Sequence, residues 1–189
     1  LKGNLNNLAC RELQFSSELL GEDLKEILPL IKDGQSDSAS LDNMFELLVA
    51  SGRDLCHAML MLIPQAWGSK YHMGKDVRAF FEYNSALIEP WDGPAAVAFS
   101  DGINAGAILD RNGLRPARYT VTTDNVLVLA SETGVLDIPE DKVLKKGRLR
   151  PGEIIYCDLE NHRIIYDAAV KKTAARNLPY RRWINENRI

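Results

Sequence analysis

The chain changes from helical to strand-forming sequence around residues 107–119, which read Ala107-Ile108-Leu109-Asp110-Arg111-Asn112-Gly113-Leu114-Arg115-Pro116-Ala117-Arg118-Tyr119. An apolar run enters a turn at Asn112-Gly113, a pair that tolerates the positive φ angles of a type I′ turn and so predicts a β-hairpin. Four charged side chains lie at or beside this turn: Asp110, Arg111, Arg115 and Arg118. A simple connector does not require so much charge, so we expect either a docking hairpin or part of a site wall.

The sequence before this stretch carries mainly helical patterns. Apolar residues recur at roughly helical spacing in the first 31 positions and are expected to face the core: Leu13, Leu19, Leu20, Leu24, Ile27, Leu28 and Ile31. Further helices are expected from Leu41 onward, from Asp54 to Pro64, and from Lys75 to Ile88 before Glu89-Pro90.

Polar residues precede the helix expected from Leu41. Ser36, Asp37 or Ser38 is placed to be its N-cap, accepting a hydrogen bond from an otherwise free backbone N–H. A carboxylate at such a position could also receive the ammonium group of a ligand. The two roles are compatible, and both remain open at this point.

The sequence from Ala95 onward alternates short apolar runs with tight turns. The runs to Ala130 predict an antiparallel meander, because connections of two or three residues cannot join parallel strands. Several runs are apolar on both faces, so the sheet should be covered on both sides by helices or by a second sheet. Residues 145–152 are expected to form a basic loop. A hairpin around Glu160-Asn161-His162 and a helix from Asp167 toward Arg176 should follow.

Composition narrows the possible functions. The chain has 189 residues, 46% of them hydrophobic, and the simplest organisation is one domain or a large part of one. A net charge of -3 argues against a general nucleic-acid or membrane surface. The sequence has no apolar run of about 18 residues and no features of a signal peptide at its start. We therefore expect a soluble protein of the reducing cytoplasm.

The cysteines and histidines give no metal or redox motif. Cys10, Cys56 and Cys157 lie in apolar patterns without metal-ligand spacing, so all three are expected to be buried, reduced thiols. His57 lies inside an apolar helical pattern and is expected to be a packed core residue. We assign no metal site and find no serine elbow, Cys-x-x-Cys motif or dinucleotide fingerprint.

Motifs spread over nearly the whole chain resemble one known family. They are Ser36-Asp37-Ser38-Ala39-Ser40-Leu41-Asp42-Asn43, Glu89-Pro90-Trp91-Asp92-Gly93-Pro94-Ala95, Leu109-Asp110-Arg111-Asn112-Gly113-Leu114-Arg115-Pro116 with Arg118-Tyr119, and Gly147-Arg148-Leu149-Arg150-Pro151-Gly152. Together and in this order they resemble the glutaminase domain, a class II glutamine amidotransferase, of the glutamate synthase large chain.

The resemblance implies an α+β fold that is part of a four-layer αββα N-terminal nucleophile hydrolase fold with stacked antiparallel sheets. Residues 1–189 would be the C-terminal portion of a single such domain. In the family, an N-terminal cysteine thiolate attacks the side-chain amide of glutamine, and the released ammonia converts 2-oxoglutarate to glutamate elsewhere in the enzyme. FMN, an iron–sulfur cluster and an electron-supplying small subunit are implied for the complete enzyme, and no cofactor for this chain.

The sequence departs from the complete family pattern at its start. The family's nucleophilic cysteine, its substrate-binding arginine and its oxyanion Asn-Gly pair would all precede Leu1, which has no nucleophilic atom. No catalytic residue is therefore assigned, and the isolated chain is expected to be inactive. One residue does match: by resemblance, Asp37 is the aspartate that pairs with the α-ammonium group of bound glutamine.

The arginines Arg111, Arg115 and Arg118 are interpreted as charged anchors that orient the hairpin against neighbouring domains.

A different class of function also stays open, in which the chain keeps the fold as a non-catalytic binding or interaction module. The sequence upstream of Leu1 discriminates the two, because only the enzyme requires the cysteine and the Asn-Gly pair.

Overall fold

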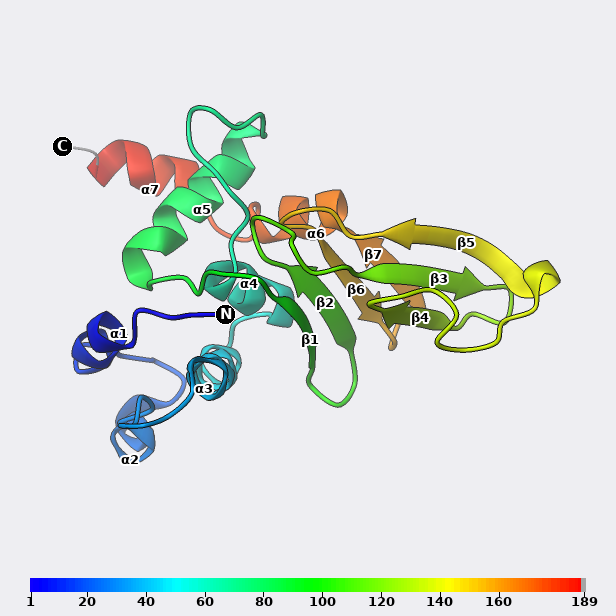
Figure 1. Cartoon of the computed structure of the whole chain (residues 1–189). Coiled ribbons are helices and arrows are strands. Elements are labelled where there is room, and N and C mark those ends of the chain that lie inside the picture. Colours follow the sequence, from blue (N-terminus) through cyan, green and yellow to red (C-terminus); the bar gives the residue numbers. More distant parts are fainter. Residues whose placement is uncertain (188–189) are drawn as a thin grey trace.

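The computed structural model describes residues 1–187, which form helices and two antiparallel sheets (Figure 1). The helices are α1 (Leu5–Glu12), α2 (Leu24–Ile27), α3 (Asp37–Ala50), α4 (Leu55–Leu62), α5 (Lys75–Leu87), α6 (Asp167–Ala174) and α7 (Tyr180–Asn187), with short 3₁₀ turns at Gly21–Asp23 and Glu140–Lys142. The strands are β1 (Ala96–Ser100), β2 (Ala105–Leu109), β3 (Arg118–Thr122), β4 (Leu127–Ala130), β5 (Val143–Arg148), β6 (Ile154–Asp158) and β7 (Arg163–Tyr166). None of the described helices is long and apolar enough to cross a membrane. The α+β class is as predicted.

The strands divide into a four-stranded sheet of order β1-β2-β6-β7 and a three-stranded sheet of order β4-β3-β5. Three predicted hairpins are confirmed: β1 with β2 across Asp101-Gly102, β3 with β4 across residues 123–125, and β6 with β7 across residues 160–162. Residues 145–148 were expected in a loop but belong to β5, which pairs with β3. The basic side chains of this segment are carried by an edge strand, where a polar face is tolerated.

The predicted hairpin at Asn112-Gly113 is wrong, and the single meander is wrong with it. The strands on either side of this turn, β2 and β3, belong to different sheets. Gly113 has a φ of +61°, whereas Asn112 does not have the positive φ that a type I′ turn needs at its first central residue. The stretch 107–119 carries the chain from one sheet to the other.

Asp110 explains why the chain leaves the first sheet here. Its side chain is 1% exposed and accepts hydrogen bonds from three backbone N–H groups, those of Ala95 (3.0 Å), Asn112 (2.9 Å) and Gly113 (3.2 Å). Its backbone carbonyl also accepts from the N–H of Gly152 at 2.9 Å. A buried carboxylate needs this many donors to offset its lost hydration. A turn built around Asp110 therefore replaces the turn built around Asn112-Gly113.

Two hydrophobic clusters define the layers. The larger cluster packs helical residues such as Met44 and Phe80 against one face of the four-stranded sheet, through Phe99, Ile108 and Ile154. The smaller cluster joins the opposite face of that sheet to the second sheet, with members Ala107, Leu109, Ala117, Leu149 and Ile155 and with Tyr119, Leu127, Leu129 and Ile164 packed against it. The four-stranded sheet is covered by helices on one side and by a sheet on the other, as its apolar strands predicted. Figure 1 shows the three-stranded sheet on the side away from the helices.

The prediction for the first 31 residues is wrong in part. Leu13 and Leu19 are 85% and 71% exposed, and Ile27 is also exposed. A charged side chain takes an interior position instead: Glu12 is buried, and its Oε2 accepts from the backbone N–H groups of Leu30 (3.0 Å) and Ile31 (3.2 Å). Because the segment is broken into α1, a 3₁₀ turn and α2, no single helical period runs through it.

The C-terminal helices α6 and α7 pack against the rest of the structure, and α6 fixes the loops that contain Gln65 and Gly152. The buried Lys171 of α6 ion-pairs with Asp167 (2.6 Å), donates to the carbonyl oxygen of Gly152 (2.8 Å) and contacts the side-chain oxygen of Gln65. Helix α7, which was not predicted from the sequence, buries Tyr180 against Phe80 and other aromatic rings. These contacts hold α6 and α7 on the helical layer.

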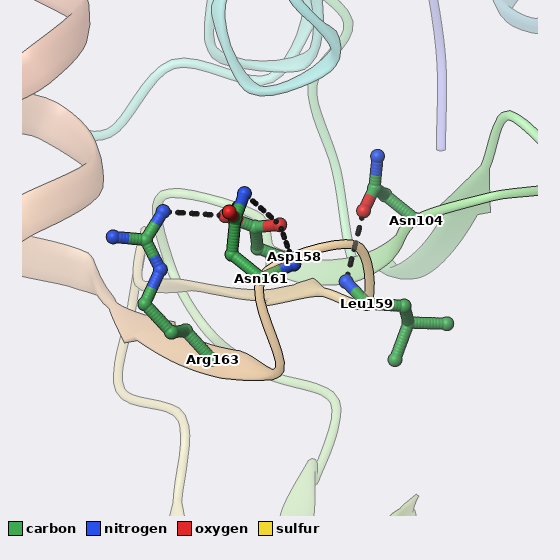
Figure 2. A network of polar contacts seen from close by, with 5 residues as sticks. All are labelled: Asn104, Asp158, Leu159, Asn161 and Arg163. Atoms are coloured by element: carbon green, nitrogen blue, oxygen red, sulfur yellow. Dashed lines mark hydrogen bonds and ion pairs between the residues drawn. The ribbon is translucent and has the colours of Figure 1, made fainter.

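A polar network links two hairpins of the four-stranded sheet (Figure 2). Asp158, at the end of β6, ion-pairs with Arg163 (2.7 Å) and accepts from the backbone N–H of Asn161 (3.0 Å). The Arg163 guanidinium and the Asn161 amide beside Asp158 hold the pKa of that carboxyl below its usual range. The side-chain oxygen of Asn104, from the β1–β2 hairpin, accepts from the N–H of Leu159 at 2.9 Å. The network satisfies backbone N–H donors near two turns, so we interpret its role as structural.

Candidate functional site

Asp37 is the first residue of α3. Ser36 is the N-cap of this helix, and its hydroxyl oxygen accepts from the N–H of Ala39 at 3.2 Å. The predicted capping role therefore belongs to Ser36. The side chain of Asp37 is not needed as the cap and is available for other contacts.

Asp37 joins two distant segments. Its Oδ1 accepts a 2.6 Å hydrogen bond from the backbone N–H of Gly3, and its backbone carbonyl oxygen accepts a 2.7 Å hydrogen bond from the indole Nε1 of Trp91. Two backbone hydrogen bonds, of 2.6 Å and 2.8 Å, pair Lys2 with Asp92 in an isolated antiparallel bridge. The chain start, the beginning of α3 and the segment after α5 meet at this point.

Gly3 is required by the close approach of Trp91. A Cβ atom added at Gly3 would lie 2.7 Å from both Cε2 and Nε1 of the indole, closer than real Cβ atoms come. Trp91 is itself buried. The position of the Asp37 carboxylate therefore depends on a glycine and a tryptophan that are far apart in sequence.

Gly3 and Asp37 line an open depression of about 710 Å³, within the size range of small-molecule sites. Its lining residues are Lys2, Gly3, Asn4, Leu5, Asn6, Asp37, Pro90, Asp92 and Gly93. It holds two carboxylates and is the candidate site.

The two carboxylates differ in their partners. Asp92 is bound by Arg111, whose Nε lies 3.0 Å from Oδ1 and which also contacts Oδ2, a bidentate arrangement. Asp37 takes part in no ion pair within residues 1–187. The negative charge of Asp92 is already compensated, whereas Asp37 is the carboxylate of the depression that can receive a cationic group such as an ammonium.

The stretch 107–119 reaches this site through one residue. Arg111 was expected to anchor a hairpin against neighbouring domains; in the structure it binds Asp92 of this chain. Arg115 and Arg118 are exposed, and neither forms an ion pair in the described part of the chain. Sequence reasoning singled out Asp37 but missed Gly3, Trp91 and the Asp92–Arg111 pair as its surroundings. Trp91 and Asp92 directly follow Glu89-Pro90 in one of the motifs that carry the family resemblance, and that motif was the signal that could have marked them as site residues.

All three cysteines are free thiols, and none of them lines the depression. Cys56 is buried in α4, and burial raises the pKa of its thiol. Cys157 is half-buried in β6, and burial raises the pKa of its thiol as well. The expectation that all three are buried is confirmed for Cys56 and met only in part by Cys157. It is wrong for Cys10, which is exposed because Leu8 occupies the interior face of α1. Residues 1–187 contain no group of three His, Cys, Asp or Glu side chains that could hold a metal ion.

His57 is a core residue, as predicted. It is 7% exposed, its Nε2 lies 3.4 Å from Oδ1 of Asn84, and its ring packs edge-on against Phe80. Burial lowers the pKa of His57 below its ordinary value of 6.5, and this effect outweighs the opposing hydrogen bond with Asn84. The neutral imidazole is therefore the form that the fold favours.

Comparison with known proteins gives the class. The family model of the class-II glutamine amidotransferases matches residues 1–183. The chain therefore belongs to the class-II glutamine amidotransferase family.

Three relatives are similar to the chain along its whole length. It is 51% identical over its full length to the glutamate synthase [NADPH] large chain of Bacillus subtilis (strain 168). It is 42% identical over its full length to glutamate synthase [NADH] of Schizosaccharomyces pombe, and 43% identical over its full length to ferredoxin-dependent glutamate synthase 2 of Synechocystis. It spans only 12%, 9% and 12% of the lengths of these relatives, respectively.

Proposed function

We propose that this chain is the C-terminal portion of a glutaminase domain within a glutamate synthase polypeptide. The domain would hydrolyse glutamine and supply ammonia for converting 2-oxoglutarate to glutamate. Family membership supports the reaction class, and the names of the relatives support the setting. The helical layer and the two facing sheets are compatible with part of a four-layer αββα domain.

Asp37 would bind the α-ammonium group of glutamine. The observation that carries this assignment is the contrast between Asp37, which has no ion-pair partner within residues 1–187, and Asp92, which Arg111 neutralises in the same depression. The hydrogen bond from Gly3 engages one oxygen of Asp37 and orients the carboxylate. A charge-assisted contact with the ammonium would select an amino acid over a simple amide.

The nucleophile and the oxyanion donors would come from residues that precede Leu1 in the complete polypeptide. Leu1 lies beside Gly93 at the depression: its Cα is 3.6 Å from where a Cβ of Gly93 would be. Residues before Leu1 would therefore enter beside Gly93, one of the residues that line the depression. The thiols of Cys10, Cys56 and Cys157 are not proposed as substitutes, because none of them lines the depression.

The remaining chemistry would lie in other parts of that polypeptide. The cysteines of this chain form no cluster and fit no iron–sulfur centre. An iron–sulfur cluster would therefore be bound by another domain. We propose that FMN and any electron-supplying small subunit are bound there as well, and that the ammonia passes to that part of the polypeptide.

The test compares Asp37→Asn with Asp42→Asn in the complete polypeptide. Both changes remove one carboxylate from α3, but Asp42 is exposed and does not line this depression. Loss of a charged hydrogen-bond partner costs about 1.5–3 kcal/mol, so the KM for glutamine should rise about tenfold to a hundredfold in Asp37→Asn. The turnover number should change less. An unchanged KM in Asp37→Asn would exclude the assignment.

The isolated chain is expected to release no ammonia from glutamine. A coupled ammonia assay on purified chain tests this expectation, and glutaminase activity that co-purifies with the chain would refute it. The reading frame upstream of Leu1 tests the alternative of a non-catalytic module: absence of the cysteine and of the Asn-Gly pair would favour that module.

A further inference from the structure

A second cavity lies within the helical layer, between α1, α3, α4 and the end of α5. Its volume is about 260 Å³. It shares no lining residue with the Asp37 depression among the residues described, although α3 contributes to both. Its lining residues are Arg11, Gln14, Phe15, Ser16, Ser17, Leu24, Met44, Leu47, Leu48, Ser51, Arg53, Met61, Ala86, Leu87 and Ile88.

The inner wall of this cavity is apolar. Met44, Met61, Leu48 and Ile88 are all buried core residues that line it. Two of them are methionines, whose flexible, polarizable side chains adapt to irregular apolar ligands. The half-buried ring of Phe15 adds a flat apolar surface. This wall suits a hydrocarbon group.

The rim of the cavity carries positive charge. The guanidinium of Arg11 is compensated, because it ion-pairs with Glu89 at 2.7 Å and donates to the carbonyl oxygen of Ala86 at 3.1 Å. Arg53 is different: its Nη1 donates to the hydroxyl of Ser51 at 3.0 Å, and it takes part in no ion pair within residues 1–187. Arg53 is half-buried, so it lacks the full hydration of a surface arginine.

We propose that this cavity binds a small carboxylate that carries an apolar chain. The carboxylate would pair with Arg53, whose planar guanidinium offers two parallel donors, and the chain would lie on Met44, Leu48 and Met61. A neutral apolar ligand would leave Arg53 without a counterion, and an amine would be repelled by it. A multiply charged anion would place charge against Met44, Leu48 and Met61, the part of the wall that offers no side-chain donor. The amphipathic monocarboxylate satisfies both parts of the cavity.

The first test uses octanoate, octanol and octylamine as probes, with the 189-residue chain in isothermal titration calorimetry. Octanoate should bind at one saturable site, and in a separate thermal unfolding measurement the midpoint should rise with the logarithm of octanoate concentration above its Kd. Octanol and octylamine have the same tail and should bind at least about tenfold more weakly, because they lack the charged pair with Arg53. Equal affinity for octanol, or no saturable binding of octanoate, contradicts the proposal.

The length of the tail is the second test. Each buried methylene should strengthen binding about fourfold, so affinity should rise steeply from butanoate to octanoate. It should then level off once the cavity is filled. An affinity that does not depend on tail length would mean that the tail stays in water, and would overturn the proposed placement.

Variants locate the site. Arg53→Met keeps an apolar stem but removes the charge, and it should weaken octanoate binding at least about tenfold. Arg53→Lys keeps the charge without the planar fork and should bind with intermediate affinity. Arg148→Met is the matched control, because Arg148 is exposed on β5 in the other sheet. Equal weakening in Arg148→Met and Arg53→Met would indicate non-specific attraction. Should Arg53→Met fail to fold, Arg53→Lys and the three head groups decide the question.

Discussion

The indole Nε1 of Trp91 donates a 2.7 Å hydrogen bond to the backbone carbonyl oxygen of Asp37, 54 positions earlier in the chain. Gly3 lies against the same indole and donates its N–H to the carboxylate of Asp37. The geometry of the candidate site is therefore set by three segments that meet only in the folded chain.

Gly3→Ala should disturb this meeting point. The new Cβ would lie 2.7 Å from the indole, so either Trp91 or the chain start must move, at a cost of about 1–3 kcal/mol in unfolding free energy. Urea unfolding followed by tryptophan fluorescence measures it. Gly74→Ala is the control, because a Cβ there meets no atom within 4 Å and its φ is negative. An equal and small loss in both variants would contradict the packing argument.

The sequence identified Asp37 but not what positions it. The carboxylate stands out in the printed sequence because it belongs to a recognisable motif before a helix. The contacts of Gly3 and Trp91 with it depend on tertiary packing and leave no local periodicity. Likewise, no pattern in the sequence tells that Asp92 is compensated by Arg111 while Asp37 is left without an ion pair in the described part of the chain.

Asp110→Asn should destabilise the crossover between the sheets. An asparagine keeps the size of the side chain, but its NH₂ group would face a backbone N–H donor in place of an acceptor oxygen. The expected loss is about 1.5–3 kcal/mol in the free energy of unfolding, measured by urea titration. Asp124→Asn is the matched control, because it removes an exposed ion pair with Lys142 that is worth about 1 kcal/mol or less. A loss in Asp110→Asn no larger than in the control would argue against a central role for Asp110.

The same residue shows why sequence reasoning failed at the crossover. Asn112-Gly113 has a strong local preference for a hairpin turn, and the flanking apolar runs look like its two strands. Two tertiary hydrogen bonds outweigh that preference. The N–H of Ala95 donates to the Asp110 carboxylate, and the N–H of Gly152 donates to the Asp110 backbone carbonyl. The hairpins at residues 101–102 and 123–125 formed as predicted; the carboxylate of Asp101 accepts from Ile103 and Asn104, which belong to its own turn.

The chain should become less stable in mild acid because the unfolded chain protonates His57 more readily than the folded chain. Its pKa in the folded chain lies below 6.5, mainly because burial disfavours the imidazolium, so the unfolded chain binds the proton more readily. The free energy of unfolding therefore decreases as pH falls below 6.5 and stops decreasing below the folded pKa. The groups around the ring act as well: Asn84 and Asp54 favour the charged form, whereas Arg53 opposes it.

Unfolding of His57→Gln over the same pH range isolates this effect. The variant should be less sensitive to acid than the original chain, because its residue at this position does not titrate. His162→Gln, which removes an exposed imidazole, is the control. Identical pH dependence of the original chain and His57→Gln would show that His57 does not contribute.

Cys10 should be the first thiol to react. It is exposed on α1, whereas burial raises the pKa of the Cys56 thiol and keeps it from forming a thiolate. Maleimide labelling of the folded chain followed by peptide mass spectrometry should find Cys10 modified first and Cys56 modified only after unfolding. Cys10→Ser should remove the fast phase. Rapid labelling of Cys56 in the folded chain would contradict the burial described here.

The central claim is that Asp37 binds the α-ammonium group of glutamine, and one measurement tests it most directly. It compares hydrolysis of glutamine and of glutaramate, the analogue without that ammonium group, by the complete polypeptide and its Asp37→Asn variant. The original polypeptide should prefer glutamine in kcat/KM, and Asp37→Asn should lose about tenfold to a hundredfold of that preference while its activity on glutaramate is retained. A preference for glutamine that survives the substitution unchanged would contradict the account.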